Sequence, residues 1–418
     1  MFLRATLPKI TIGVGDRFGL EGEAQLKAVM KIQELGIDAA PVWNKSFREH
    51  SLVGTKPEDV RIEADAAVKA LGWTNPYFVD ADHIRLANVD AFAQASDFFT
   101  IDVADSIGQP VPQEECENFA IRHADLVGEL KIEGLDTPVK ITTEMLLNAA
   151  AKYLGAVKDA AAVYKRVLEL RGKDDFSTEI SMDETTSPQT PAELLAILAA
   201  VADEQIPIQT IAPKFSGEFH KGVDYVGDPK LFAAEFDADV AIVKFAIAKW
   251  NFPATLKLSV HSGSDKFAIY PAIAKTIRKH NTGVHIKTAG TTWLEEVAGL
   301  AASGDAGLAV AKKICLQALP KIDELIAPYA TVLSIDKSRL PSAEEIASWD
   351  SDTFVGKLVH EEDAPLYNPD FRQFVHISYS IAAAMGDEYI NAIKANREKV
   401  GEFVTYNLFE RHLKRLAL

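Results

Sequence analysis

The sequence predicts an α/β protein built on a closed (β/α)8 TIM-like barrel, with a helical insertion and a C-terminal helical extension. Short apolar or β-branched runs alternate with longer amphipathic runs along most of the chain. Eight short runs occur, which is the strand count of a closed barrel. Each short run ends at a group of polar or ionisable residues, as strands do at the active-site end of such a barrel.

The predicted strands follow one another with a helical signal between most of them. The run Glu21–Gly36, for example, has the apolar spacing of an amphipathic helix, and so has Pro57–Leu71. The eight predicted strands are Lys9–Gly15, Asp38–Trp43, Pro76–His83, Asp97–Asp105, Phe176–Glu184, Ile206–Lys214, Leu256–Val260 and Val284–Lys287.

The predicted organisation is one structural unit with two parts. Residues 1–300 would form the barrel, with a helical insertion near residues 110–171. Residues 301–418 would form a helical extension packed on the barrel. No linker rich in Gly, Ser or Pro separates the two parts, so we expect no independent module.

Composition excludes several partners. The 418 residues carry a formal net charge of −16, which argues against nucleic acid and against an anionic membrane surface. A few local lysines can still bind a small anion. The start of the chain lacks the apolar core of a signal peptide, and no apolar run is long enough for a membrane span. Cys116 and Cys315 are expected to be inert thiols in a cytoplasmic protein. The sequence does not decide whether the protein forms an oligomer.

Three histidines stand at the ends of different predicted strands. His83, His261 and His285 come from separate strands, and imidazole is the commonest ligand for zinc-like divalent ions. The alternative is that each makes only a local hydrogen bond. We predict that they bind one divalent metal ion of the Zn, Mn, Co or Ni class, with Asp183 or Glu184 as a further ligand.

Carboxylates and cations at the same strand ends provide candidates for catalysis and substrate binding. Asp82 and Glu218 are the predicted proton-transfer pair, with Asp183 as a rival. A Schiff-base lysine at Lys214 or Lys287 is an alternative that the residues leave open. The predicted substrate-binding residues, suited to an anionic sugar acid, are Arg17, Lys45, Lys214, Ser262, Asp265, Lys266 and Lys287.

Other catalytic motifs are missing from the sequence. The segment Gly13–Gly19 resembles a dinucleotide-binding fingerprint, but its third glycine is one position late and no acidic residue ends the next strand. No P-loop, HExxH or GxSxG motif occurs. The sequence therefore favours a metal surrounded by carboxylates and lysines.

Five stretches resemble the bacterial tagaturonate/fructuronate epimerases of hexuronate catabolism. They are GDRFGL (Gly15–Leu20), SMDET (Ser181–Thr185), APKF with KGVDY (Ala212–Tyr225), SVHSGSDKFAIYP (Ser259–Pro271) and HIKTAGTTWLEE (His285–Glu296). The resemblance implies a TIM-like, divalent-metal-dependent epimerase that inverts the hydroxyl-bearing carbon β to the ketone of a keto-uronate. It also implies that His83, His261 and His285 match the family's histidine metal ligands.

Two chemical routes and two other functions stay open at this point. The β carbon is not directly acidified by the ketone, so inversion can proceed by metal-assisted proton removal and return, or by retro-aldol cleavage and re-addition. A metal-dependent sugar-acid aldolase could use the same site. A non-catalytic sugar-acid sensor could keep the lysines, but it would not need three metal-poised histidines beside carboxylates.

Overall fold

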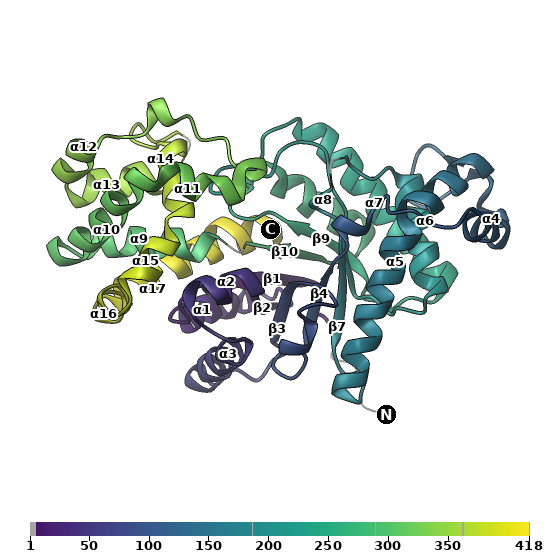
Figure 1. Cartoon of the computed structure of the whole chain (residues 1–418), viewed down its shortest axis with the longest axis horizontal. Helices are drawn as coiled ribbons and strands as arrows, with labels where there is room; N and C mark the ends of the chain where they lie inside the picture. The colour runs from purple at the N-terminus through teal and green to yellow at the C-terminus, as the bar shows by residue number, and fades with distance from the viewer. Residues whose placement is uncertain (1–5, 186, 289, 362, 418) are drawn as a thin grey trace.

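The computed structural model describes residues 6–417 apart from residues 186, 289 and 362, and eight of its strands close into a parallel barrel. The strand order around the barrel is β1-β10-β9-β8-β7-β4-β3-β2, with helices packed around it (Figure 1). The predicted TIM-like barrel is confirmed. The barrel strands are β1 (Ile10–Gly15), β2 (Ala39–Ser46), β3 (Phe78–Ile84), β4 (Phe98–Asp102), β7 (Ser177–Ser181), β8 (Thr210–Ala212), β9 (Lys257–His261) and β10 (Val284–Lys287).

Between β4 and β7 the chain adds helices and a small antiparallel pair of strands. The pair consists of β5 (Gly128–Leu130) and β6 (Val139–Ile141), flanked by α4 (Gln113–Arg122) and α5 (Thr143–Arg171). The sequence predicted only helices here, because strands of three residues are too short to show a periodic pattern. Helix α5 begins where Thr142 accepts a hydrogen bond from the Met145 amide, and it ends at Gly172 with φ of 67°.

The other helices before the C-terminal region lie on the outside of the barrel. Local signals fix their ends; in α6, for example, Thr190 and Glu193 form a capping box and Pro191 starts the first turn. These helices are α1 (Gly22–Glu34), α2 (Phe47–Val53), α3 (Pro57–Leu71), α6 (Pro191–Asp203), α7 (Pro229–Trp250), α8 (Tyr270–His280) and α9 (Thr291–Ala302).

The C-terminal region is helical and shares a hydrophobic core with one side of the barrel. Strand β1, α1 and α9 contribute to the same buried cluster as the later helices. A Cβ at Gly299 in α9 would lie 2.6 Å from the Cα of Val400, so α9 and α17 touch at their backbones. The later helices are α10 (Asp305–Ala318), α11 (Ile322–Ile326), α12 (Ala343–Ser348), α13 (Ser351–Leu358), α14 (Pro369–Ile377), α15 (Tyr379–Met385), α16 (Asp387–Ala395), α17 (Arg397–Tyr406), a π-helical turn (Asn407–Leu413) and α18 (Lys414–Ala417).

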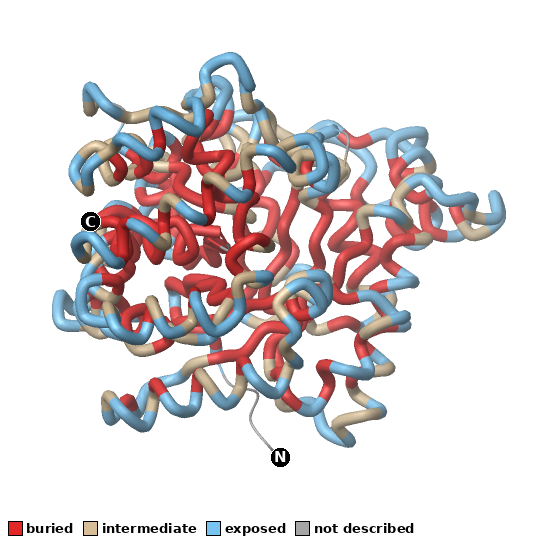
Figure 2. The backbone as a smooth tube through the Cα atoms, turned by 60° about the vertical axis from the view of Figure 1, so that its left-hand side comes forward, coloured by how far each residue is buried: buried red, intermediate tan, exposed pale blue. Residues whose placement is uncertain are grey.

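Burial is concentrated in the strands and on the inner faces of the helices (Figure 2). Many of the buried side chains in the barrel are charged, including Asp80, Glu179 and Lys287. Such groups are rarely buried unless they are paired, so the barrel interior must hold a compensated charge network. Of the helices described, none is both long enough and apolar enough to cross a bilayer.

Candidate active site

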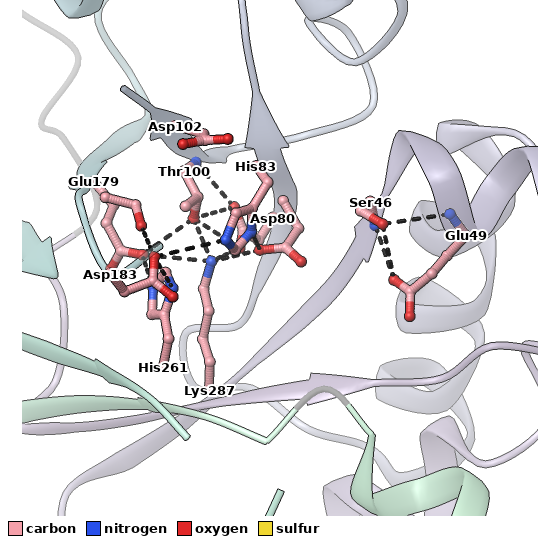
Figure 3. A network of polar contacts seen from close by, with 12 residues as sticks. Ser46, Glu49, Asp80, His83, Thr100, Asp102, Glu179, Asp183, His261 and Lys287 are labelled. Atoms are coloured by element: carbon pink, nitrogen blue, oxygen red, sulfur yellow. Dashed lines mark hydrogen bonds and ion pairs between the residues drawn. The ribbon is translucent and has the colours of Figure 1, made fainter. Parts of the chain in front are cut away.

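Lys287 lies at the centre of a buried charge network near the C-terminal end of the barrel. It pairs in register with Gly13 on β1 and His261 on β9. Gly13 leaves room for the lysine stem, because a Cβ there would lie only 2.8 Å from Lys287 Cγ. The ammonium nitrogen reaches Asp80 Oδ2 at 2.8 Å and Asp82 Oδ1 at 2.7 Å, both on β3 (Figure 3).

A third carboxylate, that of Glu179 on β7, lies 3.4 Å from the same ammonium. Burial disfavours a charged lysine, but Asp80, Asp82 and Glu179 together raise the pKa of Lys287 above its ordinary value. Lys287 is therefore a fully engaged cation. Its amine is not free to form a Schiff base or to bind substrate directly, so this arrangement does not favour the two roles that the sequence suggested for it.

Two histidines above this network are each held by a carboxylate through one ring nitrogen. His261 Nε2 lies 2.7 Å from Glu179 Oε1, and His83 Nδ1 lies 2.9 Å from Asp82 Oδ1. The remaining nitrogens face Asp183: His261 Nδ1 is 3.1 Å and His83 Nε2 is 3.8 Å from its Oδ1 (Figure 3). Although burial disfavours the imidazolium, Asp183 and Glu179 raise the pKa of His261 to about 9.

An irregularity in β3 brings His83 to this position. Adjacent residues of a regular strand point to opposite faces, so Asp82 and His83 could not both face the barrel mouth. The register between β3 and β4 shifts between Ala81 and Ile84, and His83 has φ of 53°. A positive φ outside glycine costs free energy and is concentrated at functional sites.

His83, Asp183 and His261 have the donor set of a divalent-metal site. One ligand atom from each lies within 4.8 Å of the others. His261 Nδ1 is buried, and its 3.1 Å contact with Asp183 Oδ1 does not have hydrogen-bond geometry. Metal-binding histidines commonly hold their second nitrogen against a carboxylate, as both histidines do here. These residues therefore fit a divalent cation.

The structure does not bring His285 to the other two histidines. His285 lies two residues before Lys287 on β10, about 7 Å nearer the other end of the barrel. Its Nδ1 lies 2.9 Å from Thr11 Oγ1, and its ring packs 5.3 Å from that of Phe98. Burial lowers its pKa to about 3. The expected convergence of three histidines is thus not formed, because strand alternation places His285 one layer deeper.

Three residues predicted to bind substrate instead support the loop after β9. Asp265 accepts hydrogen bonds from Arg372 Nη2 at 2.7 Å and pairs with His412 Nε2 at 2.9 Å. Ser262 Oγ donates to the carbonyl of Lys287 at 2.6 Å. The Lys266 ammonium donates to main-chain carbonyls within 3 Å. The polar groups of all three are engaged in internal contacts.

The remaining predicted residues lie nearer the mouth. Arg17 Nε contacts Glu49 Oε1 at 3.3 Å, and its guanidinium lies 3.8 Å from the ring centre of Tyr379. Lys45 donates to the Arg17 carbonyl at 2.6 Å, and burial lowers its pKa. Lys214 is partly buried after β8. Glu218 lies in the same loop with its side chain 59% exposed, whereas Asp82 is buried.

Two residues of this network, Asp80 and Glu179, were not predicted as site residues. Burial and the neighbouring carboxylates raise the pKa of Asp80 to about 6 in spite of Lys287. The alternation of strand side chains between the two faces of a sheet could have identified Asp80 and Glu179 as site residues. Asp80 shares a strand face with Asp82, and Glu179 shares one with Ser181 and precedes Asp183 by four residues.

Comparisons with known proteins identify the family of the chain. The family described as UxaE, tagaturonate epimerase, matches residues 3–416. A tagaturonate/fructuronate epimerase of Thermotoga maritima is 26% identical over 425 residues, which cover 97% of this chain and 80% of the relative. Residue 289, inside the motif His285–Glu296, lies outside the described residues.

Solved structures show the same fold. A glycerol-complexed fructuronate-tagaturonate epimerase of Cohnella laeviribosi has a TM-score of 0.81 and 24% identity, covering 99% of this chain and 82% of that one. The native crystal structure of the same epimerase has a TM-score of 0.80, with the same identity and coverage. Because the family match spans nearly the whole chain, the chain belongs to the tagaturonate epimerase family and is an isomerase-class enzyme, an epimerase.

Proposed function

We propose that this enzyme interconverts tagaturonate and fructuronate and uses a divalent cation bound by His83, Asp183 and His261. The observation that carries the proposal is the paired arrangement of the histidines. Each is oriented by its own buried carboxylate, and both present their other nitrogen toward Asp183. This replaces the predicted set of three histidines by two histidines and one carboxylate.

The bound cation would polarise the ketone of the substrate and stabilise negative charge on its oxygen. The protein's own residues have separate tasks. Glu179 and Asp82 fix which ring nitrogen of each histidine carries the proton, and Lys287 balances both carboxylates. Lys287 and His83 hold the pKa of Asp82 well below its usual range although burial acts in the opposite direction. Asp82 is therefore better suited to orienting His83 than to accepting a proton.

For proton transfer we retain Glu218. Its carboxylate stands in the loop after β8, is exposed and lies 3.9 Å from His220 Nε2. An exposed carboxylate in a loop at this end of the barrel can reach both substrate and solvent, as a proton-transfer group must. Removal of the Glu218 carboxylate should lower kcat and leave metal binding unchanged.

The retro-aldol route suits this site better than direct proton removal. The carbon to be inverted is β to the ketone, so the negative charge left by its proton would not be shared with the carbonyl. In the retro-aldol route the hydroxyl of that carbon loses its proton, the bond to the carbon α to the ketone breaks, and the electron pair moves to the ketone oxygen. Re-addition to the opposite face of the aldehyde, with return of the proton, gives the epimer.

The proposal is tested by following the interconversion of the two keto-uronates by 13C NMR with stripped and metal-reconstituted enzyme. Chelation should abolish turnover, and one added divalent metal should restore it. His261→Gln should lose both bound metal and turnover. His280→Gln is the matched control, because His280 is also buried beside a carboxylate, Asp237, at 3.0 Å. Full activity of stripped enzyme or of His261→Gln would contradict the metal role.

Heavy water separates the two routes. Direct proton removal and return would place solvent deuterium on the inverted carbon. The retro-aldol route leaves that carbon's hydrogen in place, because only the bond to the neighbouring carbon breaks. We expect no deuterium at the inverted carbon after one turnover, and stoichiometric incorporation there would contradict the retro-aldol assignment.

A further inference from the structure

A rigid turn at residues 220–223 carries a lysine toward the mouth of the barrel. The backbone amide of Lys221 donates to the carbonyl of Val332 at 2.9 Å. Three buried side chains fix the rest of the turn: Lys266 donates to the carbonyls of His220 and Val223, Ser264 Oγ accepts from the Gly222 amide, and Arg372 Nε donates to the Gly222 carbonyl. The buried charges after β9 therefore position Lys221.

The Lys221 ammonium has no ion pair or hydrogen bond within the described part of the chain. It lies 5.8 Å from the ring centre of Tyr329, and a Cβ on Gly263 would be 4.0 Å from it. Burial and the nearby guanidinium groups of Arg17 and Arg48 lower its pKa. Glu49 pairs with Arg17 at 3.3 Å and partly offsets these charges, but the Lys221 ammonium keeps no direct anionic partner among the described residues, and such a group favours an anion.

A buried histidine beside the same loops also lacks a partner. His376 is 1% exposed, and neither of its ring nitrogens makes a hydrogen bond within the described residues. Its ring lies against Gly290, where a Cβ would be 1.8 Å from Nε2. Arg17 Nη1 donates to the His376 carbonyl at 3.2 Å. An unpartnered buried polar group of this kind is costly unless a ligand satisfies it.

The position of these groups matches the place where barrels bind anions. Gly263 follows β9 and Gly290 follows β10, which are the seventh and eighth barrel strands, and the loops there often bind phosphate-like anions. The Gly290 amide donates to the Gly263 carbonyl at 3.2 Å, so the two loops touch. Helix α9 begins directly after Gly290 without a side-chain cap, and a helix N-terminus favours negative charge.

We propose that Lys221, with Arg17 and His376, binds the carboxylate of the sugar acid at the end remote from the ketone. The assignment rests on the proposed function for the identity of the substrate. Gly263 is two residues from His261, a span of at most about 7 Å of chain, so a six-carbon acid can reach from the metal-binding residues to Lys221. Lys45 does not compete for this role, because its ammonium donates to the carbonyl of Arg17.

A binding measurement tests the subsite without requiring turnover. Calorimetry with D-galactonate and with galactitol compares a six-carbon acid with its uncharged alcohol. The wild type should bind the acid at least about 10-fold more tightly, since a hydrogen bond to a charged group contributes roughly that much. Lys221→Met should weaken binding of the acid by about 10-fold and leave binding of galactitol unchanged, because one charged hydrogen bond is lost while Arg17 remains.

Two further variants keep the test decisive. Lys221→Arg preserves the charge and should retain most of the preference for the acid. Lys230→Met removes an exposed lysine from the start of α7 and should change neither affinity. The proposal is overturned if the wild type does not prefer the acid, or if Lys221→Met, folded as judged by circular dichroism, keeps the full preference. If the wild type prefers the acid but shows no epimerase activity toward the two keto-uronates, the proposed function is refuted and the carboxylate subsite is retained.

Discussion

Lys287→Met removes an ammonium that lies within reach of three buried carboxylates. Asp80, Asp82 and Glu179 lie 2.8, 2.7 and 3.4 Å from its nitrogen. Methionine keeps most of the stem volume, so packing against Gly13 is retained and the main change is electrostatic. Removing one partner of a buried ion pair costs about 3–5 kcal/mol, and we expect a loss of that size in the free energy of unfolding at pH 8.

The loss should depend on pH in a definite direction. Without the lysine at least one carboxyl group takes up a proton on folding, so its pKa in the folded state lies further above its unfolded value. A raised carboxyl pKa means that stability is present at low pH and is lost as pH rises through the folded-state value. In the wild type Asp80 has a pKa of about 6, so above that pH it has largely lost its proton. A carboxyl group that stays protonated in folded Lys287→Met therefore destabilises the variant, relative to the wild type, by about 1.4 kcal/mol more for each pH unit between about pH 6 and 8.

Urea titrations of metal-free protein at pH 6 and pH 8 measure this difference. Lys230→Met is the control, because Lys230 is exposed at the start of α7 and contacts none of these three carboxylates. Its destabilisation should not grow between the two pH values. If Lys287→Met costs less than about 1 kcal/mol at pH 8, or the same at both pH values, the charge-balancing role assigned to Lys287 is refuted.

Three other changes test parts of the structure away from this network. Burial and Asp16 raise the pKa of Glu21 to about 8, so its carboxyl group makes the wild type less stable as pH rises from 4.5 to 8. Over that range the free energy of unfolding of Glu21→Gln, measured in urea titrations, should rise by about 1–3 kcal/mol relative to that of the wild type. Asp265→Asn should lower the melting temperature strongly, while Asp323→Asn, in an exposed pair with lysine, should not. Gly290→Ala should cost about 1–3 kcal/mol by overlap with the imidazole of His376, and His376→Ala should rescue most of that loss.

The barrel was predictable because its strands carry strong local signals. Runs such as Ile10–Gly15 and Val284–Lys287 are short and contain β-branched residues, and the structure has both as parallel barrel strands. Register was not predictable from the same signals. His285 and Lys287 share a strand face, but only the pairing of β10 with β1 and β9 shows which of them is level with His261. His285 was therefore expected at the metal site and lies deeper in the barrel.

Backbone irregularity and long-range pairing account for the remaining differences. A regular β3 would point either Asp82 or His83 inward, and the register shift that brings both to the mouth leaves no mark in the residue types. Asp265 and Lys266 were expected to bind substrate, but Arg372 and the 220–223 turn satisfy them from distant parts of the chain. Charged residues at strand ends indicate a site, whereas their partners depend on tertiary contacts that periodicity cannot reveal.

The charge distribution explains how a chain with a net charge of −16 can bind a sugar acid. Salt screens exposed charges beyond about 8 Å, so the local groups determine the potential at the barrel mouth. The carboxylates gather around His83 and His261, and Arg17, Arg48 and Lys221 gather around Tyr329 and Tyr379 of the C-terminal region. With the proposed cation at the histidines, this arrangement would place positive charge near the ketone and cationic side chains near the carboxylate. On this reasoning the C-terminal helices contribute to substrate binding, and barrel residues alone would leave the acid end unbound.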